Sequence, residues 1–138
     1  MILDNIHRVP SRVEEPVDWP FRLPAMLTEA GVQVSLRHTG MLARGRNLPF
    51  YAGTSAAYGM EKEEALKMIT SNTAKALGVD SQMGTMESGK DATLLIVAGD
   101  LLDMRSSIIE KAFIQGRDVE IEGKQQVLYE RFKEKYSK

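Results

Sequence analysis

The residues with the clearest capacity for chemistry follow an apolar run in the first third of the chain. The run Val32–Leu36 stops at Arg37, His38, Thr39 and Gly40. A histidine can bind a metal ion or transfer a proton near neutral pH, and α/β enzymes place such groups at the carboxyl end of a strand. The segment is therefore an active site, the remnant of one, or a turn.

Further candidate residues lie near this predicted strand end. Arg44 and Arg46 follow in a glycine-containing loop, and together with Arg37 they surround the predicted strand end. Guanidinium groups could hold a substrate carboxylate through paired hydrogen bonds; the alternative is a solvated basic loop. The other histidine, His7, is interpreted as a hydrogen-bonded loop anchor, with a substrate contact as the alternative.

The elements that must position these residues have the order strand, loop, helix, strand. Residues 1–9 are typical of a short buried strand, and the three prolines of residues 10–20 predict an irregular loop, because proline lacks a backbone donor. Pro24 suits the first turn of a helix that Gly31 ends. Since Val32–Leu36 is the next strand, we expect parallel pairing and an α/β fold class.

Helices are predicted for the middle of the chain. Asn47 can cap a helix that carries Pro49 in its first turn. A second helical pattern starts near Glu61, is interrupted at residues 71–73, and stops at Gly78. We therefore expect either a bent helix or two separate helices after residue 60.

The last third of the chain is predicted to be extended and then helical. The apolar run 93–97 predicts a strand, and the alternation around residues 115–116 predicts a hairpin. Leu128, Phe132 and Tyr136 are four residues apart, which places them on one face of a C-terminal helix. We interpret this face as core or interface packing.

Composition limits the classes of function. The 138 residues contain no cysteine, which excludes disulfides and thiolate metal sites. The formal net charge is −1, so there is no electrostatic reason to expect nucleic acid or a membrane surface as a partner. No apolar run approaches the roughly 20 residues that span a bilayer. The N-terminus does not resemble a signal peptide, and the sequence assigns no cellular compartment.

Three motifs in the second half of the chain occur in a characteristic order. They are Ala65–Gly78, which contains Ile69-Thr70-Ser71-Asn72; Gly84–Ala92, which contains Glu87-Ser88-Gly89-Lys90-Asp91; and Phe113–Arg117. Together they resemble the C-terminal end of a metal-dependent amidohydrolase of the imidazolonepropionase-like group. The resemblance extends over about residues 31–121.

The resemblance implies a (β/α)8 barrel with one or two divalent metal ions and a small β-sandwich built from both chain ends. A barrel takes roughly 250 residues, so this chain would be a C-terminal fragment with the last two strand–helix units. By resemblance, residues 1–80 are the barrel segment, 81–123 belong to the composite β-sandwich domain, and 124–138 form a C-terminal helix. Residues 1–9 and 32–36 would be the seventh and eighth barrel strands.

The resemblance also assigns a role to the strand end. The family binds its metal ions through a His-x-His pair, further histidines and an aspartate after strand eight, which also takes a proton from the metal-bound water. This sequence has two histidines and no His-x-His pair. Gly40 aligns Thr39 with the aspartate, and a register shifted by one residue would place His38 there. A threonine hydroxyl is a weak ligand and a poor base.

The resemblance therefore implies an intact parent enzyme that hydrolyses a C–N bond in a small amide, cyclic amide or peptide-like substrate, using water activated by a zinc-like divalent metal ion. We expect the 138-residue chain alone to bind no metal and to be inactive, because such sites need three or more converging ligands. The alternative is a non-catalytic, degenerate family member or interaction module. Unpaired strand edges predict self-association into a dimer or higher oligomer.

Overall fold

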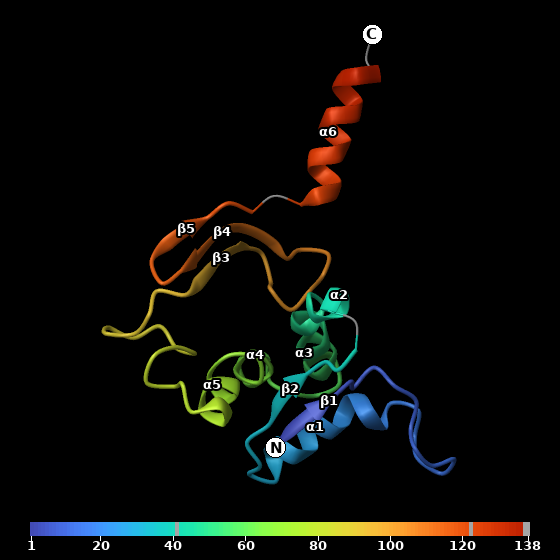
Figure 1. The fold of residues 1–138 in the computed structure, drawn as a ribbon. Coiled ribbons are helices and arrows are strands. Elements are labelled where there is room, and N and C mark those ends of the chain that lie inside the picture. The colour runs from blue at the N-terminus through green and yellow to red at the C-terminus, as the bar shows by residue number, and fades with distance from the viewer. Residues whose placement is uncertain (41, 122, 137–138) are drawn as a thin grey trace.

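The computed structural model describes residues 1–40, 42–121 and 123–136. These residues form five strands and six helices in the order β1, α1, β2, α2, α3, α4, α5, β3, β4, β5, α6 (Figure 1). The mixed α/β content agrees with the expected fold class. Among the described residues, none of the helices combines the length and the apolar character needed to cross a membrane.

The first sheet is a pair of parallel strands. β1 (Ile2–Asp4) pairs with β2 (Ser35–Arg37), so that Ile2 lies opposite Ser35 and Asp4 opposite Arg37. Both strands are shorter than expected. β1 ends at Asp4 because Asn5 adopts a φ of 45°, which takes the chain out of the extended conformation. Ahead of β2, the amino group of Met1 donates to the Gln33 carbonyl at 2.5 Å, and the Met1 carbonyl accepts from the Ser35 N–H at 2.9 Å.

The first helix begins earlier than the sequence predicted. α1 (Trp19–Glu29) has Pro20 in its first turn, and Pro24 lies inside the helix instead of starting it. Proline removes a backbone donor from a helix interior. Both proline side chains are fully buried, so tertiary packing offsets the missing hydrogen bond. Gly31, with a φ of 79°, follows the helix end as expected.

Four more helices complete the N-terminal part of the molecule: α2 (Leu42–Gly45), α3 (Leu48–Ala57), α4 (Lys62–Lys67) and α5 (Ser71–Leu77). α4 and α5 confirm that the pattern after residue 60 is two helices. Glu61 caps α4 by accepting hydrogen bonds from the backbone N–H groups of Glu63 and Glu64 at 2.7 and 3.2 Å. Asn47 stands at the N-cap of α3, but its side chain makes no capping bond there.

The buried core lies where these helices meet the first sheet. Met68, Ala65 and Ala52 have no exposed surface, and Val34 of the segment before β2 is 1% exposed. The core's buried members come from α1, α3, β2 and α4 and from the segments beside these elements: Ile6, Ala25, Val34, Leu36, Tyr51, Ala52, Met60, Ala65 and Met68.

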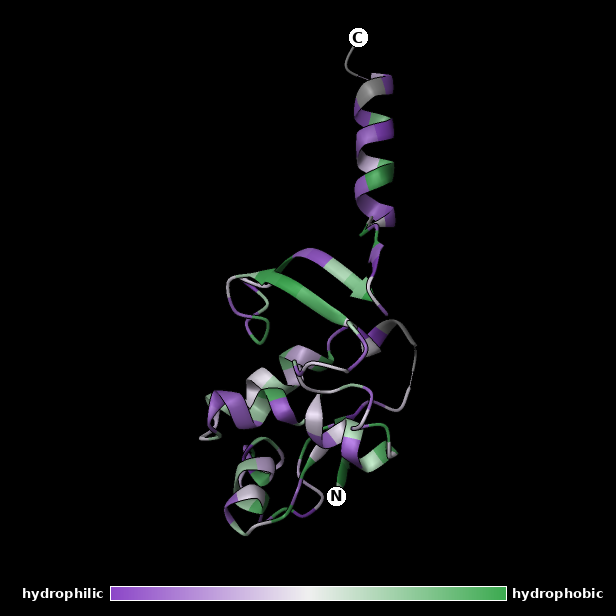
Figure 2. Cartoon of the chain, turned by 90° about the vertical axis from the view of Figure 1, so that its left-hand side faces the viewer, coloured by the Kyte–Doolittle hydropathy of each residue, from purple (hydrophilic) through white to green (hydrophobic). Residues whose placement is uncertain are grey.

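The second sheet is antiparallel and has the strand order β3 (Leu94–Ala98), β4 (Ile108–Ile114), β5 (Arg117–Val119). Gln115 and Gly116 have φ values of 50° and 76°, which confirms the predicted hairpin turn. β3 is apolar along its length, whereas β4 and β5 mix charged residues with apolar ones (Figure 2). Several of them are exposed, among them Ile108 and Ile114.

α6 (Lys124–Tyr136) extends away from the rest of the molecule (Figure 1). Its apolar face is exposed: Leu128, Phe132 and Tyr136 are 37%, 48% and 71% accessible. The interpretation of this face as core packing is therefore wrong for this structure. The alternative, interface packing, stays a prediction.

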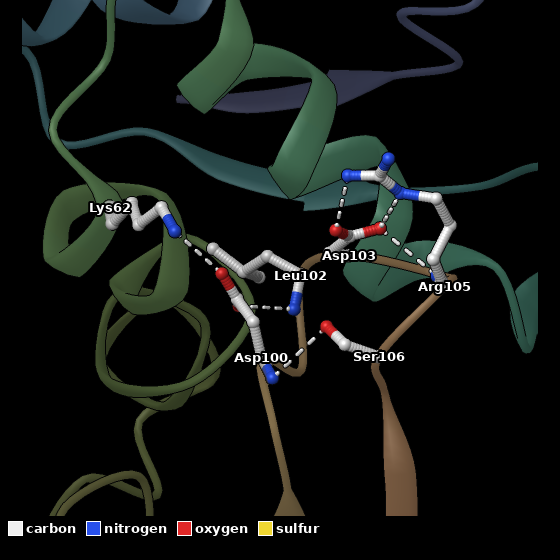
Figure 3. A network of polar contacts seen from close by, with 6 residues as sticks. All are labelled: Lys62, Asp100, Leu102, Asp103, Arg105 and Ser106. Carbon is white, nitrogen blue, oxygen red and sulfur yellow. Dashed lines mark hydrogen bonds and ion pairs between the residues drawn. The ribbon is translucent and has the colours of Figure 1, made fainter.

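The loop between β3 and β4 lies on α3 and α4 (Figure 3). Lys62 Nζ contacts Asp100 Oδ2 at 2.6 Å, and the other oxygen of Asp100 accepts a hydrogen bond from the Leu102 N–H at 2.9 Å. A Cβ on Gly53 of α3 would lie 2.1 Å from the Leu102 carbonyl oxygen. Only glycine at this position allows the loop to approach α3 so closely, which connects the second sheet to the helices.

Candidate functional site

The carboxyl ends of β1 and β2 bring a carboxylate, a guanidinium group and a hydroxyl together. The Thr39 N–H donates to Asp4 Oδ1 at 2.8 Å, and the Thr39 hydroxyl donates to Asp4 Oδ2. Arg37 Nη2 lies 3.5 Å from the same Oδ2. The side chains of Asp4 and Arg37 are 30% and 59% exposed, so this strand end is accessible from solvent.

Hydrogen bonds from Thr39 control the charge of this carboxylate. The Thr39 hydroxyl and then the Thr39 N–H lower the pKa of Asp4 from its ordinary value, with smaller electrostatic contributions from Arg37 and His38. Burial acts in the opposite direction and is outweighed. Asp4 is therefore an ionised carboxylate at neutral pH.

The His38 side chain is directed to a different neighbour. Its ring stacks on Tyr51 of α3, with centroids 5.4 Å apart and ring planes at 25°. Among the described residues, its buried Nδ1 has no hydrogen-bond partner. A Cβ on Gly40 would lie 3.3 Å from His38 Cε1, so the glycine leaves room for the ring. Of the two alternative site residues, Thr39 contacts the carboxylate directly and His38 packs on an aromatic ring.

His7 is an anchor between the loop after β1 and α3. Its Nε2 lies 2.7 Å from the hydroxyl oxygen of Thr54. The ring lies 4.4 Å from that of Tyr51 and 5.7 Å from that of Phe21, measured between centroids. Burial lowers the pKa of His7 below its ordinary value. The interpretation as a hydrogen-bonded anchor is confirmed.

The three arginines occupy different surroundings. Arg37 is paired with Asp4, whereas Arg44 in α2 and Arg46 after it are exposed. In the part of the chain that the structure describes, neither Arg44 nor Arg46 is bonded to Asp4, His38 or Thr39. The structure does not bring the three guanidinium groups together on one carboxylate.

Sequence reasoning missed two residues. Asp4 was overlooked because residues 1–9 were treated as one strand, although a carboxylate directly after the apolar pair Ile2-Leu3 could have marked a strand end. Asn72 belongs to the predicted interruption of the helical pattern at residues 71–73. It lies inside α5, and its Nδ2 donates to the Val34 carbonyl at 2.9 Å, which joins α5 to the strand segment.

The strand end does not provide a metal centre by itself. Across residues 1–40, 42–121 and 123–136, no three His, Cys, Asp or Glu side chains converge as metal ligands. The one carboxylate present, Asp4, already accepts both hydrogen bonds of Thr39. The described residues therefore do not fit a metal ion without ligands from elsewhere.

A groove of about 430 Å³ lies between α3 and the β3–β4 loop, and residues such as Phe50, Leu102 and Met104 line it. Its charged side chains are paired with one another: Lys62 with Asp100, and Arg105 with Asp103 at 2.9 Å. These ion pairs hold the β3–β4 loop in place (Figure 3). We therefore interpret the groove as a feature of the packing between this loop and α3.

Comparisons with known proteins point to one family. The model of the amidohydrolase family matches residues 21–123. A 5-methylthioadenosine/S-adenosylhomocysteine deaminase from Teredinibacter turnerae is 33% identical over 92 residues, which cover 59% of this chain and 21% of the deaminase.

Solved structures give the same result. An amidohydrolase from Thermotoga maritima MSB8 is 32% identical with a TM-score of 0.68, over 74% of this chain and 26% of that protein. Another amidohydrolase, 19% identical, shares the fold with a TM-score of 0.62 over 77% of this chain and 27% of its own. The chain spans between 21% and 27% of the length of these relatives.

Proposed function

Because the chain belongs to the amidohydrolase family of metal-dependent, TIM-barrel hydrolases, we propose that it serves the hydrolysis of a C–N bond. The substrate class is a small amide, cyclic amide or peptide-like molecule. The deaminase relative supports this bond class, since removal of an amino group also cleaves a C–N bond. In the complete enzyme a divalent, zinc-like metal ion would activate the attacking water.

In this proposal the chain supplies the C-terminal part of the barrel. β1 and β2 are its last two strands, residues 1–80 its last two strand–helix units, residues 81–123 its share of a composite β-sandwich, and residues 124–138 the C-terminal helix. The parallel pairing of β1 with β2 supports this assignment. So does the 26% share of the Thermotoga structure that the chain matches.

The observation that carries the functional proposal is the strand end. There, at the carboxyl end of a parallel strand pair, Asp4 contacts both Arg37 and Thr39. α/β-barrel enzymes hold their reacting groups at this end of their strands. The reading frame upstream of Met1 tests it. A continuous frame that encodes a His-x-His motif is the expected result, and a genuine stop codon directly before Met1 would contradict the proposal.

The isolated 138-residue chain should be inactive and should bind no divalent metal tightly. It has two histidines and no His-x-His pair, and the resemblance places Thr39, or His38 in the shifted register, where the family has its aspartate. The measurement is elemental analysis after dialysis, together with an assay of amide hydrolysis. Stoichiometric metal bound with sub-micromolar affinity would overturn this prediction.

A non-catalytic, degenerate family member is the second candidate. Thr39 favours it, because a hydroxyl replaces the carboxylate that the resemblance predicts. Metal analysis of the complete protein discriminates, since stoichiometric zinc, nickel or iron is expected only of the hydrolase. For either candidate, we propose self-association of the chain, and for the hydrolase a small-molecule substrate.

A further inference from the structure

We propose that Asp4 supplies the functional carboxylate of this strand end and that Thr39 is its positioning residue. The inference rests on the proposed hydrolase function. In this inference the anionic group lies on β1 and not after the neighbouring strand β2. Residue 39 still contributes to the site, because it holds that group in place.

The geometry of the pair supports this transfer. Parallel register places Asp4 opposite Arg37, so the carboxylate faces the segment that follows β2. Thr39 then offers two donors in one residue: its N–H reaches Asp4 Oδ1 at 2.8 Å, and its hydroxyl reaches Oδ2. Both carboxylate oxygens are thus fixed by a single residue 35 positions away in the sequence.

The carboxylate keeps the capacity to act on a ligand. Each carboxylate oxygen has two lone pairs, and Oδ1 receives one hydrogen bond from Thr39. Asp4 is 30% exposed, so a substrate donor or a water molecule can reach it. Arg37 lies at 3.5 Å with a side chain 59% exposed, which offsets the negative charge only in part.

The same contacts explain why an aspartate at position 39 would not simply restore the family pattern. Thr39→Asp would remove the donor hydroxyl and place a second negative charge beside Asp4, and like charges at hydrogen-bond distance repel. A carboxylate at one of the two positions is compatible with this geometry. Carboxylates at both positions would repel each other unless they shared a proton.

The test compares four variants of the complete protein that contains this chain: Asp4→Asn, Thr39→Val, Thr39→Asp and the exchange Asp4→Thr/Thr39→Asp. Asp4→Asn keeps the shape and the acceptor for the Thr39 N–H but removes the charge. We expect it to lower kcat by about 10²-fold or more, the range for loss of a positioned acid or base. Thr39→Val should lower kcat less. The kcat of the exchange variant should be at least about tenfold higher than that of Thr39→Asp.

A second readout separates positioning from a structural role. Asp4 in the 138-residue chain should titrate below an ordinary aspartate in NMR, and Thr39→Val should raise its pKa towards the ordinary value. Asp103→Asn is the matched control. Arg105 donates hydrogen bonds to that carboxylate in a similar way, at a position distant from Asp4 in the sequence. The control should leave kcat and KM within about twofold of wild type, below the tenfold that 1.36 kcal/mol represents.

The outcomes are distinguishable. If the complete wild-type protein hydrolyses no C–N bond, the proposed function and this inference both fail. If the wild type is active and Asp4→Asn, folded by circular dichroism, retains its kcat, the inference alone is overturned. If Asp4→Asn does not fold, Thr39→Val decides: an unchanged kcat together with an unchanged Asp4 titration contradicts the positioning role.

Discussion

At the scale of single residues, the charge of Asp4 depends on its partner across the strand pair. Hydrogen bonds from Thr39 lower the pKa of Asp4 in the folded chain. The folded state therefore binds this proton less readily than the unfolded state, whose aspartates titrate near about 3.9. The contribution to stability is present above that value and is lost as the pH falls through and below it.

Acid unfolding of the chain should show this dependence. In Asp4→Asn, the unfolding free energy should fall less between about pH 5 and pH 2 than in wild type, because one linked proton is removed. Urea unfolding at a series of pH values measures the slope. Asp118→Asn, the same type of substitution at an exposed position of β5, serves as the control. Equal slopes for wild type and Asp4→Asn would contradict the Thr39–Asp4 contact.

His7 should give a separate response at higher pH. Burial lowers the pKa of His7, so its neutral form is the one that suits the fold. The stability it contributes is present above the unfolded-state pKa of about 6.5 and is lost as the pH falls through the lower, folded-state value. His7→Phe should flatten the decline in unfolding free energy below about pH 6.5, although loss of the Thr54 bond lowers stability at neutral pH. An unchanged decline would mean that His7 is not the titrating group.

At the scale of secondary-structure elements, the sequence correctly predicted helix ends and a hairpin turn. Glu61 and Gly78 marked the beginning of α4 and the end of α5, and the hairpin formed around Gln115 and Gly116. These features depend on residues a few positions apart: a capping carboxylate and residues that accept positive φ.

Non-local contacts account for the errors. The length of β1 depends on where Asn5 leaves the sheet and on which residues pair with β2. Pro24 is tolerated inside α1 because it is fully buried, which no local rule reveals. The Asp4–Thr39 contact joins positions 35 residues apart, so it becomes visible only when the parallel register is known. For the same reason the strand end was recognised on β2 and missed on β1.

The contact between α3 and the β3–β4 loop gives a prediction with an unusual sign. Gly→Ala inside a helix commonly stabilises a protein by about 0.5–1 kcal/mol. At Gly53 the new Cβ would lie 2.1 Å from the Leu102 carbonyl oxygen. Gly53→Ala should therefore destabilise the chain by about 1–3 kcal/mol, the usual cost of overpacking, as measured by urea unfolding.

Gly45→Ala is the matched control for this substitution. Gly45 lies at the end of α2, and among the described residues outside its own helix and chain neighbours no atom lies within 4 Å of its added Cβ. The control should be neutral or stabilising by a few tenths of a kcal/mol. If Gly53→Ala stabilises the chain as much as Gly45→Ala does, the loop does not approach α3 as described.

At the scale of the whole molecule, apolar side chains are exposed on the second sheet and on α6. On the second sheet, Leu95 and Ile108 are 49% and 63% accessible, and on α6 Phe132 and Tyr136 are 48% and 71% accessible. Within the described part of the chain, β3 and β5 are the edges of their sheet, and β1 and β2 pair only with each other. Open edges invite pairing with another chain, and a helix of 13 residues is marginal in water without packing.

Self-association is the expected consequence of these exposed surfaces. Burial of about 400 Å² of apolar surface on each of two chains would return about 20 kcal/mol at 25 cal/mol per Å², which exceeds the roughly 4–15 kcal/mol that association costs. We predict a dimer or higher oligomer at low micromolar concentration, measured by sedimentation velocity. Phe132→Asp, in the centre of the exposed face of α6, should shift the chain towards monomer. Val13→Asp is the control: Val13 is 99% exposed in the loop before α1, outside both surfaces, and its substitution should leave the distribution unchanged. A wild-type chain that sediments as a monomer at every concentration would show that these surfaces do not associate with a second copy.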